Sequence, residues 1–455
     1  MFSEKSTVRT LKYFFFFLTA SISFFAVARS QTKLLVSGST IRPTFIRNIT
    51  ISGNEKTEEY VIRRELTFTN GDTLKAGLLA YNKNRIYSLG LFNKVELLPQ
   101  PIENDSVDLE ISVVERWYIF PFPLFGIYEG DWDKIFYGGG IIHSNFRGRN
   151  EKLVGSFTLG YNPSFNLYYF NPLLKEQPDI FWESQIFIKR VHSKNILSLS
   201  RGNEYDEKHY TLSSNIGRRF DLFRRVSIGG EYNSVTVTPY KPGRTYSTNG
   251  KDNYFTVKAN YSYDTRDLAN YTLYGVWFRS SIAKVGLTAT GVNFTRGAMD
   301  YRRFIPMKLD SNYSVTLAMR LFSTFSDGNN LPQYEHVFFG YSERLRGYFN
   351  TIFEGDNLAG ASMEFRFPLL QPKIYHLSFV PVTQFSLARF GLYFALFGNI
   401  GAVQYQPLKL NEFVFAKGYG AGLHFILPYD FVLRTEFALN ELRKSELIVD
   451  LGTSF

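Results

Sequence analysis

The chain has 455 residues, of which 44% are hydrophobic and 17% aromatic, with a mean hydropathy of −0.15 and no cysteine. The absence of cysteine excludes disulfides, thiolate catalysis and thiolate metal sites. The net charge of +10 argues little for nucleic-acid binding, because the lysines and arginines are scattered and often adjoin acids.

The first 30 residues have the pattern of a targeting segment. Basic residues between Lys5 and Lys12 precede an apolar core at 13–27, and small residues at 28 and 30 predict cleavage after Ser30. An uncleaved membrane anchor is the alternative. A removed signal predicts a mature chain that starts at Gln31, in the envelope of a Gram-negative bacterium.

Residues 44–116 have the pattern of a small α/β domain. An apolar strand is followed by two amphipathic helices and two further strands, in the order β-α-α-β-β. The expected elements are strand 45–51, helices 58–66 and 75–89, and strands 94–98 and 107–114.

From Trp117 to Phe455 the helical period disappears and alternating strands with short turns follow. No run of about 18 apolar residues occurs beyond residue 30, so we expect no membrane-spanning helix. Alternation with abundant aromatics favours a 16-stranded transmembrane antiparallel β-barrel. The expected strands are 117–127, 134–146, 151–161, 165–171, 178–191, 209–219, 223–237, 254–264, 275–286, 292–303, 312–324, 357–367, 391–403, 416–427, 431–439 and 446–455.

The last expected strand shows the alternation most clearly. Leu447, Val449, Leu451 and Phe455 share one face, and Ile448 lies on the other. In a bilayer such a strand must be paired on both sides, because unpaired backbone groups are not tolerated in hydrocarbon. The alternative is an edge strand of a soluble β-sandwich.

The α/β domain resembles a POTRA domain. The resemblance rests on four short segments: Ile51–Asn54, Val61–Leu66, Gly71-Asp72 and Gly90–Phe92. It implies a periplasmic domain that receives unfolded polypeptides by adding a strand to its sheet. A small α/β domain of unrelated purpose is the alternative.

The remainder resembles the superfamily of BamA, TamA and the two-partner-secretion transporters. Arg346, Gly347 and Tyr348 are similar to its Arg-Gly-Phe/Tyr loop signature. Five further motifs occur in the family's order: Asn145–Gly148, Phe170–Leu173, Tyr263–Asp267, Glu364–Pro368, and Phe397 with Asn399 and Gly401. The resemblance covers essentially the whole mature chain.

An arginine inside a closed barrel needs an anionic partner, because a buried unpaired charge is costly. The resemblance implies an aspartate where this chain has Asn399. We therefore expect Arg346 to pair with Glu364, with Asn399 as a secondary hydrogen-bond partner. Gly347 would let the loop turn tightly, and Tyr348 would pack beside it. An arginine in a solvated loop is the alternative.

The sequence offers no catalytic set. Its six histidines are dispersed without metal-ligand spacing, and no nucleophile elbow or phosphate-binding loop occurs. The glycines of Gly418–Gly422 lie within an expected strand, where they would bend the wall or make room for the loop. We expect no enzyme activity, no metal and no cofactor.

The resemblance implies an outer-membrane factor that inserts or exports polypeptides, with its POTRA domain in the periplasm. Pro121 and Pro123 remove backbone donors from the first strand, so its seam with Leu451 and Phe455 would open sideways. The expected partners are unfolded or nascent outer-membrane or secreted polypeptides, membrane lipids and lipopolysaccharide, with accessory lipoproteins left open. The alternatives are a passive channel and a structural subunit of an assembly complex.

Overall fold

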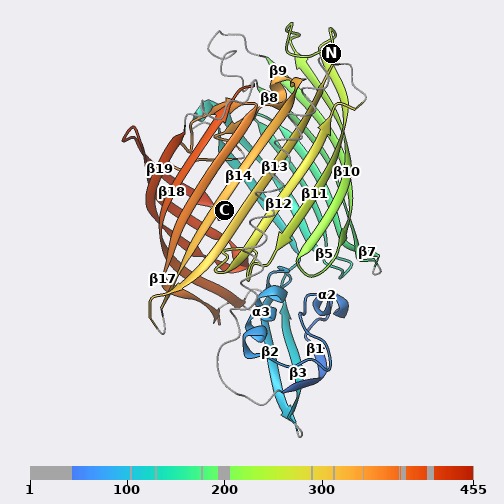
Figure 1. Ribbon diagram of the computed structural model, residues 1–455, viewed down its shortest axis with the longest axis vertical. Coiled ribbons are helices and arrows are strands. Elements are labelled where there is room, and N and C mark those ends of the chain that lie inside the picture. Colours follow the sequence, from blue (N-terminus) through green and yellow to red (C-terminus); the bar gives the residue numbers. More distant parts are fainter. Residues whose placement is uncertain are drawn as a thin grey trace, which may run out of the picture. The chain divides into compact units, whose positions relative to one another are not determined.

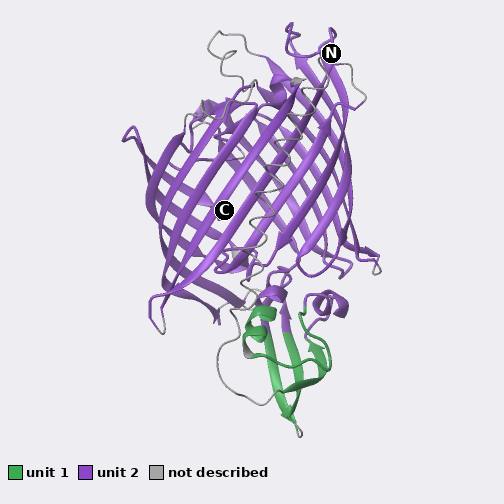
Figure 2. Ribbon diagram, in the orientation of Figure 1, with its two compact units in different colours: residues 1–52, 66–83, 96–112 green, residues 53–65, 84–95, 113–455 purple. Residues whose placement is uncertain are grey.

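The computed structural model describes residues 44–102, 105–128, 131–175, 178–192, 205–287, 291–310, 313–341, 343–378, 380, 386–406 and 415–453. The expected signal segment, 1–30, lies outside these residues. The chain divides into a smaller unit of residues 1–52, 66–83 and 96–112 and a larger unit of the remainder, which Figure 2 shows in two colours.

The amino-terminal domain has the expected β-α-α-β-β order. Its three strands form one sheet in the order β1-β3-β2, in which β1 and β3 run parallel. Buried and half-exposed residues alternate along β3, which places Val107, Leu109 and Ile111 in the core. The elements are β1 (Phe45–Ser52), α2 (Glu59–Arg63), α3 (Ala76–Tyr87), β2 (Phe92–Ile102) and β3 (Ser106–Glu115).

The larger unit contains a 16-stranded antiparallel sheet that curves round as a barrel (Figure 1). Each strand pairs with its neighbour in the sequence, except that β14 pairs with β17 across a long loop. The strands are β4 (Ile119–Ile127), β5 (Ile135–Phe146), β6 (Glu151–Gly160), β7 (Ser164–Lys175), β8 (Ile180–His192), β9 (Asp206–Arg219), β10 (Arg224–Thr238), β11 (Lys251–Asp264), β12 (Gly275–Val285), β13 (Asn293–Lys308), β14 (Ser314–Asn330), β17 (Asn357–His376), β18 (Leu387–Gln404), β19 (Ala416–Ile426), β20 (Val432–Asn440) and β21 (Ser445–Leu451).

The side chains alternate between the two faces of this sheet. On β20, Arg434, Glu436 and Ala438 are buried, whereas Phe437 between them is 52% exposed. On β21, Leu447 is 76% exposed and Ile448 only 2%. Polar residues inside and apolar residues outside are typical of barrels that stand in lipid.

Several boundaries of the expected strands differ from the structure, including those at the two ends of the sheet. The first strand starts at Ile119 rather than at residue 117, and the last ends at Leu451 rather than at 455. Gly452 has a φ of 122°, and its carbonyl accepts a hydrogen bond from Arg434 Nε at 2.7 Å, which ends the strand. Phe455 lies outside the described residues.

The ends of the sheet are β4 and β21. Among the described residues no backbone register joins these two strands. β4 has nine residues and β21 has seven, whereas β17 and β18 have 20 and 18. Within the same residues, no helix is long and apolar enough to cross a bilayer.

Candidate functional site: a buried charge network that holds the β14–β17 loop

The β14–β17 loop folds back against the inner face of the sheet. A short helical turn, η3 (Gln333–Glu335), is followed by a hairpin of β15 (Val337–Phe339) and β16 (Phe353–Gly355). The tip of the loop contains Arg346 between the paired strands of this hairpin. Leu345 is 1% exposed and packs with Phe322, Phe339, Tyr348 and Leu358, so the tip is anchored by apolar burial.

Two further ion pairs hold the loop upstream of Arg346. Glu335 accepts from Arg296 Nη1 on β13 at 2.8 Å and from the Tyr254 hydroxyl on β11 at 2.6 Å. Glu343 accepts from both terminal nitrogens of Arg320 on β14 at 3.0 Å. The loop is therefore fixed along its length by charged hydrogen bonds to the wall.

Arg346 is the centre of the site. Its Nη1 donates to Glu364 Oε2 on β17 at 2.7 Å, and its Nε donates to Asn399 Oδ1 on β18 at 2.9 Å. The same Nη1 also donates to Glu436 Oε1 on β20 at 2.9 Å, and the guanidinium lies 3.7 Å from the Phe397 ring centroid. The structure thus brings together the three residues that we expected and adds a second acid.

Glu436 supplies the charge that Asn399 lacks. Asn399 Oδ1 accepts from Arg346 while its Nδ2 donates to Ser362 Oγ at 2.7 Å, so the amide is oriented by two bonds but carries no charge. A guanidinium that is only 3% exposed needs compensation, and the second carboxylate comes from β20, two strands away from Asn399.

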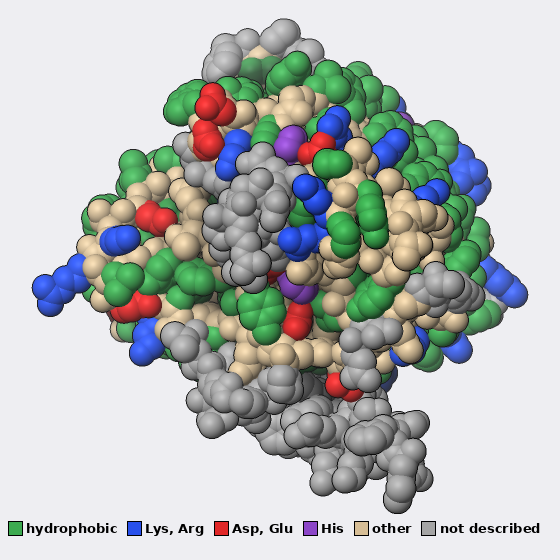
Figure 3. Space-filling view, turned by 90° about the horizontal axis from the view of Figure 1, so that it is seen from above, with side chains coloured by type: hydrophobic (Ala, Val, Ile, Leu, Met, Phe, Trp, Pro, Cys, Tyr) green, Lys and Arg blue, Asp and Glu red, His purple; other side chains and the backbone are tan. Residues whose placement is uncertain are grey.

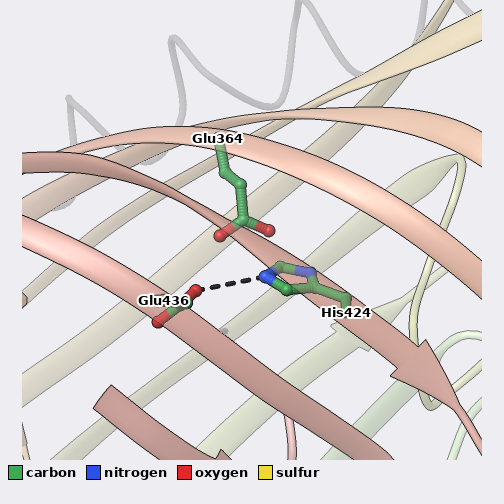
Figure 4. A group of neighbouring side chains, drawn as sticks. All are labelled: Glu364, His424 and Glu436. Carbon is green, nitrogen blue, oxygen red and sulfur yellow. Dashed lines mark hydrogen bonds and ion pairs between the residues drawn. The ribbon is translucent and has the colours of Figure 1, made fainter. Parts of the chain in front are cut away.

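Three more charged or titratable residues complete the site. Arg366 Nε donates to Glu364 Oε1 at 2.7 Å, and Arg434 Nη1 donates to Glu436 Oε2 at 2.9 Å. His424 Nε2 lies 3.1 Å from Glu436 Oε1, an interaction that Figure 4 shows. We call these residues the buried charge network: Arg346, Glu364, Arg366, His424, Arg434 and Glu436.

Glu364, His424 and Glu436 could in principle hold a metal ion, because their ligand atoms lie within 4.8 Å of one another (Figure 4). However, both oxygens of each carboxylate already accept hydrogen bonds from arginines. Asp450 also accepts from Arg434 Nη2 at 2.6 Å, so the three guanidinium groups are balanced by three carboxylates without a cation. The donor set therefore fits an ion-pair network better than a metal centre.

Two glycines make room for the loop tip. Gly347 has a φ of 95°, and its carbonyl accepts from Asn440 Nδ2 at 3.1 Å. On β19, a Cβ added to Gly418 would stand 1.7 Å from the Arg346 carbonyl oxygen. The loop backbone thus passes so close to the wall that only glycine fits at position 418, one of the glycines expected to serve this purpose.

The remaining residues of the expected site fall in two places. Tyr348 is 8% exposed and packs edge-on against Phe353, with ring centroids 5.3 Å apart. Pro121 and Pro123 lie on β4, and Leu451 ends β21, so these three belong to the two ends of the sheet and not to the network.

Sequence reasoning missed most of the buried charge network. A usable signal was present, because Glu364-x-Arg366 and Arg434-x-Glu436 each place an acid and an arginine two residues apart in an expected strand. Period-two spacing puts both on one face, and opposite charges repeated on one face of two strands would have indicated a network.

Figure 3 shows one end of the molecule, seen from above. In the view of Figure 3, lysines and arginines are interspersed with acids and hydrophobic side chains over that face. Charges of both signs in such a mixture produce little net field for a polyanion.

Two family descriptions match the chain. Residues 44–116 match "Surface antigen variable number repeat", the POTRA family, and residues 145–455 match "Omp85 superfamily domain", which covers more than half of the chain.

Curated relatives include the "Outer membrane protein assembly factor BamA" of Neorickettsia risticii and that of Neisseria meningitidis. The first is 34% identical over 111 residues, which are 24% of this chain and 14% of the relative. The second is 35% identical over 77 residues, or 16% of this chain and 10% of the relative. The chain therefore matches only a small part of the length of these relatives.

Solved structures with the same fold include BamA from Haemophilus ducreyi lacking POTRA domains 1–3 and CdiB from Escherichia coli. The first has a TM-score of 0.52 at 17% identity, over 91% of this chain and 84% of the other. The second has a TM-score of 0.52 at 9% identity, over 95% of each chain. These likenesses show the barrel fold, and the family matches together with the BamA relatives indicate an outer-membrane β-barrel that follows a periplasmic POTRA domain. The chain belongs to the Omp85 superfamily.

Proposed function

We propose that this protein inserts polypeptides into the outer membrane or exports them across it. The observation that carries the proposal is the combination of a POTRA domain with a barrel whose first and last strands are short and share no register among the described residues. The relatives named outer membrane protein assembly factor support the same class of activity.

The proposed mechanism uses backbone hydrogen bonds and no chemical step. An unfolded chain first adds a strand to the edge of the POTRA sheet, where β1 and β2 stand at the two edges. The chain then reaches the seam between β4 and β21. Pro121 and Pro123 have no N–H to donate, so β4 offers fewer bonds to hold the seam shut.

The lateral face of β21 suits an incoming strand. Leu447, Val449 and Leu451 are 76, 63 and 65% exposed on one face, while Ile448 on the other is buried. A strand with the same alternation could pair with β21 and keep its apolar side toward lipid. The incoming polypeptide would thus leave the barrel at the seam, beside Pro121, Pro123 and Leu451. Phe455 follows these residues in the sequence and belongs to the same proposed seam.

Depletion of the protein tests this proposal. Outer-membrane and surface proteomes of depleted and normal cells would be compared by quantitative mass spectrometry. An assembly or export factor predicts loss of a defined set of outer-membrane or secreted proteins, with their unfolded forms accumulating in the periplasm. A passive channel predicts altered uptake of small solutes and an unchanged surface proteome, which would contradict the proposal.

Re-expression of a seam variant in the depleted cells distinguishes the proposed function from the remaining alternative, a structural subunit of an assembly complex. A structural subunit would restore the proteome in any form that folds and reaches the membrane. A protein-handling barrel would restore it only when the seam is free to open. Abundance and heat modifiability on gels would be matched between variants before their proteomes are compared.

A further inference from the structure

The β11–β12 turn reaches the buried charge network from the opposite end of the barrel. This turn, residues 265–274, follows the eighth strand of the sheet, whereas the β14–β17 loop follows the eleventh. Neighbouring strands run antiparallel, so the two connections lie at opposite rims. Nevertheless both contact the same network: the loop binds Glu364 and Glu436, and the turn contacts Arg366 and His424.

Two residues of the turn make these contacts. The Tyr271 hydroxyl lies 3.1 Å from His424 Nδ1, and the Thr272 carbonyl accepts from Arg366 Nη1 at 3.0 Å. The Arg366 guanidinium also lies 4.5 Å from the centroid of the Tyr271 ring. Both residues are 3% exposed, so the contacts are made away from water.

The turn is built to hold this position. Asp267 Oδ1 accepts from the backbone N–H groups of Leu273 and Tyr274 at 3.0 and 3.2 Å, and Thr272 Oγ1 donates to the Leu268 carbonyl at 2.7 Å. Tyr271 has a φ of 52°, which is uncommon for a bulky residue. Such backbone strain persists only where surrounding contacts over-determine it.

Apolar packing fixes the Tyr271 ring against the wall. It packs with Tyr393, Ile426 and Val432 from β18, β19 and β20, and its ring centroid lies 4.7 Å from that of Tyr393. The turn therefore contacts the strands that carry His424 and Glu436, on which Arg346 depends.

We propose that the β11–β12 turn is a latch for the β14–β17 loop. Tyr271 orients His424, which contacts Glu436, and Thr272 orients Arg366, which contacts Glu364. Both acids bind Arg346. Displacing the turn weakens the hold on the loop tip, and displacing the loop weakens the hold on the turn. Tyr271 is thus a positioning residue that acts through the network.

The inference extends beyond the proposed function, because a latch between two rims is independent of which polypeptide is handled. Through the latch, a displacement of the turn at the periplasmic rim would change how firmly the loop from the opposite rim is held. Energetic coupling through such a network is a claim about equilibrium, so it must be reciprocal.

Cysteine labelling tests the latch, since the native chain has no cysteine. The reporter is Leu345→Cys, a site that is 1% exposed at the loop tip. The purified full-length protein in lipid nanodiscs is treated with a bulky maleimide. We expect Tyr271→Ala to raise the labelling rate about tenfold or more, because the loop tip opens more often. Tyr271→Phe, which removes only the hydroxyl, is expected to raise it about two- to fivefold.

A second reporter distinguishes a latch from general loosening. Phe181→Cys replaces a residue of β8 that is 8% exposed and packs against Phe170 of β7, with ring centroids 6.1 Å apart. Its labelling is expected to change less than about twofold in the same Tyr271 variants, because distant sites are independent. An equal rise at both reporters would overturn the proposal, as would an unchanged rate at Leu345→Cys. Tyr271→Phe keeps the test valid if Tyr271→Ala fails to fold.

The reciprocal experiment moves the reporter to the turn. Leu268→Cys replaces a residue that is 5% exposed there. Arg346→Lys removes the branched guanidinium and is expected to raise labelling of Leu268→Cys severalfold, because coupled sites affect each other equally. Labelling that responds in one direction only would contradict a shared equilibrium.

Discussion

Two regions of the barrel differ in how they are held. The wall formed by β17 to β20 carries the buried charge network and a loop whose backbone touches Gly418. The ends, β4 and β21, are short strands with prolines on one and exposed apolar side chains on the other. The comparison indicates that specific contacts concentrate where the loop docks. They extend to β21, whose Asp450 accepts from Arg434 at 2.6 Å and whose Glu446 accepts from the Phe349 N–H of the loop at 2.8 Å, whereas β4 carries the two prolines.

Replacing Arg346 should have the largest effect on stability. Arg346→Ala removes the shared partner of Glu364 and Glu436 and releases the loop tip, so we expect a loss of about 3–5 kcal/mol in unfolding free energy. Denaturant unfolding in detergent measures it. The matched control is Arg344→Ala, an exposed arginine two residues earlier, which should cost less than about 0.5 kcal/mol. Equal losses of unfolding free energy in the two variants would show that the buried charge network does not dominate the stability of the wall formed by β17 to β20.

Glu436 should account for the next largest effect. Glu436→Gln keeps the shape but removes the charge, and we expect a loss of about 2–3 kcal/mol because a charged hydrogen bond to Arg346 is weakened. Adding Asn399→Asp places a new carboxylate at a position that already accepts from Arg346 Nε at 2.9 Å. The double variant should recover at least half of the loss. If the two substitutions lower the unfolding free energy additively, or by more than the sum, the idea that Glu436 replaces an acid at position 399 is refuted.

The close approach at Gly418 gives a smaller, steric prediction. Gly418→Ala places a Cβ 1.7 Å from the Arg346 carbonyl oxygen, so the loop must move, at a cost of about 1–3 kcal/mol. The control is Gly398→Ala on the adjacent strand β18, where an added Cβ meets nothing within 4 Å. Similar unfolding midpoints for the two variants would mean that the loop is not packed against β19.

Asp267 in the β11–β12 turn gives a pH-dependent prediction. Burial raises the pKa of this carboxyl from 3.8 to about 6, although backbone N–H groups of Leu273 and Tyr274 oppose the shift. The folded state then binds its proton more tightly than the unfolded chain. The contribution of Asp267 to stability is therefore greatest below pH 4, falls as the pH rises to 6, and stays low above that.

Asp267→Asn keeps an acceptor for the same two N–H groups and carries no charge. We expect it to be more stable than the parent at pH 7.5 by about 1–2 kcal/mol, and to lose this advantage at pH 4. Unfolding curves at both pH values measure the difference. A difference in unfolding free energy that stays constant from pH 4 to pH 7.5 would show that protonation of the Asp267 carboxyl is not coupled to folding of the turn.

The strands were largely predictable and the network was not. All sixteen barrel strands lie where the alternation places them, because period-two patterning is local. The expected end of β17 at 367 is wrong, since the strand continues to His376. Pro368 and Pro372 argue against a strand, but register shifts near both positions accommodate them.

The partners of Arg346 depend on contacts that no local pattern fixes. Glu364 could be named because it lies in a recognisable motif, only 18 residues away. Glu436 is 90 residues away, and Tyr271 meets His424 across 153 residues. Such pairs follow from how strands tilt and stagger around the barrel, which the sequence of one strand does not determine.

The openable seam is the central claim, and a disulfide lock tests it most directly. One cysteine is placed in Ile119–Ile127 and another in Ser445–Leu451, and pairs are screened for oxidation on gels. The control is Phe437→Cys with Leu447→Cys, two exposed residues that are already register partners on β20 and β21. We predict that the oxidised seam pair abolishes delivery of client proteins to the outer membrane or cell surface, that reduction restores it, and that the control pair has no effect. Full delivery with a verified seam crosslink would contradict the account.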